Sequence, residues 1–152
     1  MFSAQKNQLN LLLFKKSPPK ALIQAIDKGG YRLFHAETTS NALEILKKES
    51  FQVIIAALGI NQDFSDYYED LVKEAVIKFG KKIFIIIFSH TACDDLKLRE
   101  KCFNIGANMV TSSEVALSTA LKQINVCKND KGLNLNNISD GLYRQFKMPN
   151  LF

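Results

Sequence analysis

The chain has 152 residues, 47% of them hydrophobic and 23% charged, so it is long enough for one domain with a buried core. This composition excludes intrinsic disorder for the bulk of the chain, and no apolar run approaches the roughly 20 residues that cross a bilayer. The net charge of +5 is spread along the chain in short pairs such as Lys47-Lys48, which favours solvated helix faces over a nucleic-acid groove.

The N-terminus and the cysteines indicate the compartment. Residues 1–8 carry polar side chains and lead directly into a strand, without the long apolar stretch of a secretory signal. Cys93, Cys102 and Cys127 are odd in number and widely spaced, so they form neither a CxxC motif nor an even disulfide framework. We therefore expect a protein of the cytoplasm or another reducing intracellular compartment, with no membrane association.

Strand and helix patterns alternate from the start of the chain. A strand over residues 9–14 leads to Ser17 and two prolines, which suit a helix start, and Gly29-Gly30 ends that helix. Residues 31–36 alternate in polarity, which predicts an edge or near-edge strand. Residues 38–40 then offer caps for a second helix.

The middle of the chain carries the strongest patterns. Residues 52–58 and 83–88 are apolar on both faces, which predicts central strands of a parallel sheet. Between them, residues 64–79 keep i, i+3, i+4 spacing, so we expect a helix with one wide buried stripe. The sequence therefore predicts an α/β fold.

The last third completes the pattern. We expect one helix over residues 93–105, a short strand over 109–111, and a fifth helix that opens at Glu114. With right-handed crossovers, this gives a five-stranded parallel sheet with helices on both faces. We expect the domain to span residues 1–126, followed by a linker and aromatic C-terminal tail over 127–152.

The strand ends decide what chemistry this fold offers, because ligands of such sheets bind at the carboxyl ends of the strands. Those ends read Lys15-Lys16, Ala56-Ala57 and Ser89-His90, with no cluster of carboxylates. Hard cations such as Mg²⁺ need oxygen ligands, which two lysines and an alanine do not supply. The chain also lacks the common phosphate-loop, dinucleotide, zinc-protease and nucleophile-elbow motifs. We therefore expect no enzyme activity, no cofactor and no metal.

The order of elements over residues 9–124, together with Gly106-Ala107-Asn108, resembles the receiver domain of two-component response regulators. The tripeptide is similar to the GA(D/N) turn before that family's fifth strand. The resemblance implies the flavodoxin-like, CheY-like sheet order 2-1-3-4-5. It also implies a site: an acidic pair after strand one and an aspartate ending strand three bind Mg²⁺ and accept phosphate, with a Ser or Thr after strand four and a Lys after strand five.

The chain departs from nearly all of those positions. Lys15 and Lys16 stand where the family has its acidic pair, and Ala56 stands at the phosphoacceptor position. Ser89 matches the Ser/Thr position, whereas Ser113 occupies the lysine position. The resemblance thus implies a degenerate receiver, or pseudo-receiver, whose phosphorelay chemistry is lost. A weaker resemblance is to the receiver-like segment that precedes the PAS domain in some eukaryotic cyclic-nucleotide phosphodiesterases, which also lacks normal switch chemistry.

Two function classes follow. In the first, the chain is a non-catalytic interaction or scaffold subunit that binds another protein or a multi-protein assembly, with a homodimer as one option, because receivers use the face around their fourth helix, fifth strand and fifth helix for pairing. The partner-binding candidates on that face and on the tail are Lys97, Arg99, Lys101, Val110, Val115, Tyr143, Phe146, Leu151 and Phe152. In the second, the chain senses a small anion or nucleotide over Lys15, Lys16 and Lys20, which otherwise are solvated lysines.

Overall fold

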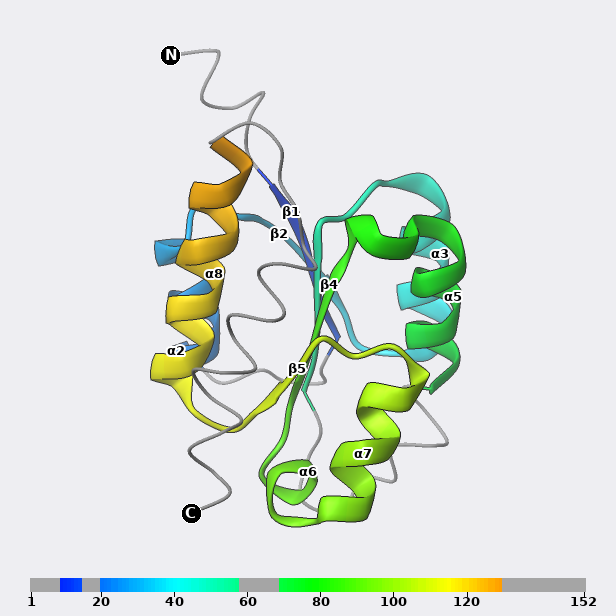
Figure 1. Ribbon diagram of the computed structural model, residues 1–152. Coiled ribbons are helices and arrows are strands. Elements are labelled where there is room, and N and C mark those ends of the chain that lie inside the picture. The colour runs from blue at the N-terminus through cyan, green and yellow to red at the C-terminus, as the bar shows by residue number, and fades with distance from the viewer. Residues whose placement is uncertain (1–8, 15–19, 58–68, 130–152) are drawn as a thin grey trace.

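The computed structural model describes residues 9–14, 20–57 and 69–129. Their strands form one parallel sheet in the order β2-β1-β3-β4-β5, which confirms the predicted topology and the edge position of the second strand (Figure 1). The strands are β1 (Asn10–Phe14), β2 (Arg32–Ala36), β3 (Val53–Ala57), β4 (Phe84–Phe88) and β5 (Met109–Thr111). Each crosses to the next through a helical connection, as parallel pairing requires.

Helices cover both faces of the sheet. Figure 1 shows α2 and α8 on one face and α3, α5 and α7 on the other. The helices of the described part are α2 (Lys20–Lys28), α3 (Thr39–Lys48), α5 (Glu69–Phe79), α6 (His90–Asp94), α7 (Leu96–Ile105) and α8 (Glu114–Asn129), with a 3₁₀ turn at Gly80–Lys82. The buried side chains accordingly form two separate core clusters, one on each side of the sheet.

Strand β3 shows how the sequence builds those two clusters. Because neighbouring side chains of a strand point to opposite faces, Val53 and Ile55 join the core beneath α2 and α8, while Ile54 and Ala56 join the core beneath α3, α5 and α7. All five residues of β3 are buried. A run that is apolar on both faces therefore marked a central strand correctly.

The predicted helix over residues 93–105 is two helices. Ser89 caps α6 by accepting a hydrogen bond from the Ala92 N–H at 3.1 Å. Asp95 then leaves the helical conformation (φ −103°, ψ 107°), and its carboxylate accepts from the Leu98 N–H at 3.2 Å to start α7. The sequence prediction missed the break because two helix-capping side chains stand only six residues apart.

The turn at 106–108 joins α7 to the sheet. Gly106 ends α7 at φ +130°, and its N–H donates to the carbonyl oxygens of Cys102 and Phe103. Asn108 then pairs with Ile85 of β4 twice: its N–H donates to the Ile85 carbonyl at 2.8 Å, and its side-chain oxygen accepts from the Ile85 N–H at 2.7 Å. The tripeptide Gly106-Ala107-Asn108, which is similar to the turn before the fifth strand of receivers, therefore holds β5 against β4.

Two of the predicted boundaries reach the limits of the described residues. Of the helix predicted over 64–79, the structure describes α5 from Glu69 onward, and residues 64–68 lie outside the described part. At the other end, α8 continues through the domain boundary expected at residue 126 and is described to Asn129. Of the linker and tail predicted over 127–152, residues 130–152 lie outside the described part. Within the described helices, none has the length and apolar character that a membrane span needs.

Candidate functional site

The rim of the sheet at the carboxyl ends of the strands is where the resemblance to receivers predicts a site. The pairing register places Phe14 beside Ala56, Ala57 beside Phe88, and Phe88 beside Thr111. The row across the last residues of β3, β4 and β5 is therefore an alanine methyl, an aromatic ring and a threonine hydroxyl. Within the described ranges, no group of three or more His, Cys, Asp or Glu side chains is placed to hold a metal ion.

The resemblance to receivers puts their phosphoacceptor at the end of the third strand. The sequence assigned it to Ala56, but β3 runs to Ala57, so the residue that ends the strand is Ala57. Ala56 is fully buried in the core cluster under α3, α5 and α7, and Ala57 is 2% exposed in the core cluster on the opposite face. Either assignment gives a methyl group where receivers have a carboxylate.

The two serines at receiver positions both cap helices. Ser89 is only 2% exposed, its N–H donates to the Thr111 carbonyl at 2.9 Å, and its hydroxyl oxygen accepts from α6. Ser113 is the residue that the resemblance puts at the receivers' lysine position, and its hydroxyl oxygen accepts from the Ala116 N–H at 3.1 Å at the start of α8. Both hydroxyl oxygens therefore satisfy backbone donors that a helix start leaves without partners.

The predicted anion site is only partly described. Lys15 and Lys16 lie outside the described residues. Lys20 is the first residue of α2, and its side chain is exposed.

A polar hollow of about 470 Å³ opens next to the rim, between α6, the start of α7, β5 and the start of α8. It brings together four of the predicted site residues, Arg99, Val110, Ser113 and Val115. The sequence reasoning missed the others, which are Cys93, Asp94, Thr111, Ser112 and Ala116. The pair Ser112-Ser113 directly after a strand was the available signal, because both residues had to lie at the carboxyl end of β5.

Two side chains give this hollow its character. The Arg99 side chain is half-buried, and its Nε is buried without a hydrogen-bond acceptor among the described residues. The Val115 side chain is 76% exposed at the mouth.

Burial raises the pKa of the Cys93 thiol, which also lines the hollow, while a hydrogen bond with Ser112 partly opposes that shift. The thiol is therefore neutral at physiological pH and is not an activated nucleophile.

The predicted partner face is divided by α7. Arg99 faces the hollow, whereas the Lys101 amine lies 3.8 Å from the Glu69 carboxylate of α5, on the other side of that helix. Lys97 is exposed one turn before Lys101 and does not line the hollow. The predicted tail residues Tyr143, Phe146, Leu151 and Phe152 lie outside the described part.

Comparison with known proteins identifies the fold but not a family. No family model matches the chain, and no curated protein matches it. Among solved structures, a CheY-like receiver domain protein from Methanospirillum hungatei JF-1 matches with a TM-score of 0.65 at 15% identity, covering 82% of this chain and 99% of that one. The receiver domain of an HD domain-containing protein from Pseudomonas fluorescens Pf-5 matches at 0.63 and 20% identity, covering 82% and 92%.

A third neighbour is a response regulator from Burkholderia pseudomallei whose structure contains a phosphorylated aspartic acid and a calcium ion. Its TM-score is 0.61 at 17% identity, with 78% of this chain and 69% of that chain covered. Identities this low establish the arrangement of strands and helices and leave the chemistry to the residues themselves. The strand order and these matches together show that the chain has the flavodoxin-like fold of a CheY-like receiver domain.

Proposed function

We propose that the chain is a non-catalytic pseudo-receiver, a subunit that binds another protein or a multi-protein assembly and does not accept phosphate. The observation that carries this proposal is the rim of the sheet. Ala56 and Ala57 offer methyl groups at the end of β3, where the receivers that the sequence resembles carry the aspartate that accepts phosphate. In the sequence, Lys15 and Lys16 directly follow β1, where receivers have the acidic pair that binds Mg²⁺. Two positively charged side chains cannot bind that ion.

The serines support the same proposal. Ser89 and Ser113 stand at positions that complete the phosphate switch in receivers, and here both hydroxyl oxygens accept hydrogen bonds from helix N–H groups. A Ser in place of the lysine also removes the cation that would pair with an acyl phosphate. The chain would thus have the receiver fold without the charged side chains that receivers use to bind phosphate.

The hollow beside β5 is the surface that we propose for the partner. The half-buried Arg99 side chain lines this hollow, and its guanidinium group can donate hydrogen bonds to an oxygen of a partner. Val115 adds exposed apolar area next to that charge, as specific interfaces require. Val110 also lines the hollow, whereas Lys97 and Lys101 would take part only if the partner extends over the outer side of α7. The tail residues Tyr143, Phe146, Leu151 and Phe152 would provide a second, separate contact.

The alternative, a sensor of a small anion or nucleotide near Lys15, Lys16 and Lys20, gains no specific support from the described residues. A thermal-shift screen against nucleotides and phosphates separates it from the interaction module, because a ligand that binds only the folded protein raises its melting temperature. We expect no shift with these anions.

We expect Val115→Glu to lower affinity for the partner by at least about tenfold, which corresponds to about 1.4 kcal/mol, because it removes apolar area and places a charge at the mouth of the hollow. The fold will be retained, since an acidic side chain in the first turn of α8 suits the helix dipole. The measurement is quantitative affinity capture from an extract of the source cells by the full chain and its variants.

The matched control is Val126→Glu. Val126 lies on the same helix and is 57% exposed, but it does not line the hollow. A chain that stops after Asn129 tests the tail in the same experiment. Equal capture by the wild type and Val115→Glu, with loss only on removal of the tail, would remove the hollow from the proposal.

A further inference from the structure

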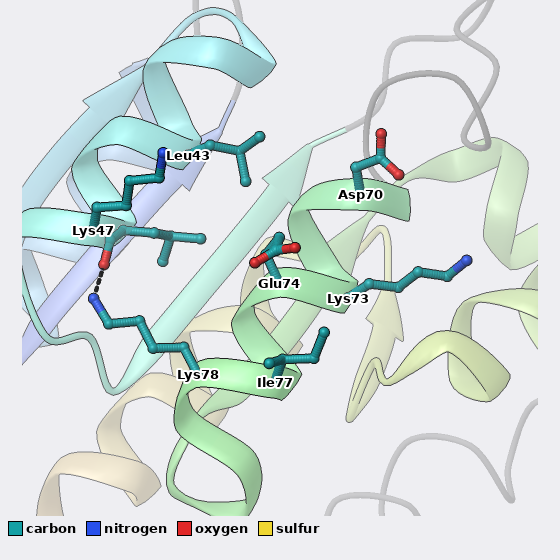
Figure 2. A pocket seen from close by; sticks show the side chains of 8 residues that line it. Leu43, Lys47, Asp70, Lys73, Glu74, Ile77 and Lys78 are labelled. Carbon is teal, nitrogen blue, oxygen red and sulfur yellow. Dashed lines mark hydrogen bonds between the residues drawn. The ribbon is translucent and has the colours of Figure 1, made fainter.

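We draw no further inference here: the strongest candidate, the groove of about 490 Å³ between α3 and α5 that is lined by Leu43 of α3 and by Glu74 and Ile77 of α5 (Figure 2), carries none because nothing in the structure shows what covers it.

Discussion

Ala56→Asp should lower the free energy of unfolding by about 4–5 kcal/mol at pH 7, because it places a carboxylate without a partner in the core. Ala56 is fully buried, and its neighbours across the sheet are Phe14 and Ile87. No cation of the described part lies in its core cluster. A phosphoacceptor at this position would therefore be incompatible with this packing.

The pH dependence identifies the cause. Burial raises the pKa of the introduced carboxyl above the unfolded value of about 3.9, so the unfolded state releases its proton first as the pH rises. The destabilisation is smallest below pH 4 and grows by about 1.4 kcal/mol per pH unit until the folded-state carboxyl ionises. Ala56→Asn is the control of equal size without a charge. Equal stability of the two variants from pH 4 to pH 7, by urea unfolding, would contradict the burial of Ala56.

Gly106→Ala should cost about 3 kcal/mol of unfolding free energy, from backbone strain and a steric clash together. Gly106 has φ +130°, a conformation that L-residues with a side chain rarely adopt. A Cβ at this position would also lie 2.5 Å from Val76 Cγ2 on α5. Thermal and urea unfolding both measure the loss, which should lower the melting temperature by roughly 6–12 °C.

Gly80→Ala is the matched control. Gly80 has φ +59°, but an added Cβ there meets nothing within 4 Å, so only backbone strain of about 1 kcal/mol is expected. The double variant Gly106→Ala/Val76→Ala should recover the steric part of the loss, since the clashing methyl group is gone. A Gly106→Ala variant no less stable than Gly80→Ala would show that α5 and α7 do not pack as described.

Much of the fold was predictable because its signals are local. The strands β3 and β4 are apolar on both faces, and the glycines at positions 29, 30 and 106 end helices where expected. The break at Asp95 was not predictable from periodicity, because α6 is only five residues long and its cap, Ser89, also resembles a strand end. Capping competes with helix continuation over distances too short for a pattern to show.

The site was less predictable because it depends on register and on helix rotation. A difference of one residue in the end of β3 exchanges Ala56 for Ala57, which is also buried but lies in the core cluster on the opposite face of the sheet. Likewise, Arg99 and Lys101 are two residues apart on α7, which places them on different sides of that helix. The groove between α3 and α5 joins residues about 30 positions apart, and no local pattern marks it.

The most direct test of the proposed loss of phosphate chemistry is incubation of the full chain with radiolabelled acetyl phosphate and Mg²⁺, beside an active receiver domain. We predict that the active receiver takes up label and that this chain retains no more than its denatured control, because the end of β3 offers only the methyl groups of Ala56 and Ala57. Stable, hydroxylamine-sensitive labelling of this chain would contradict the account, since it would require a carboxylate that accepts phosphate.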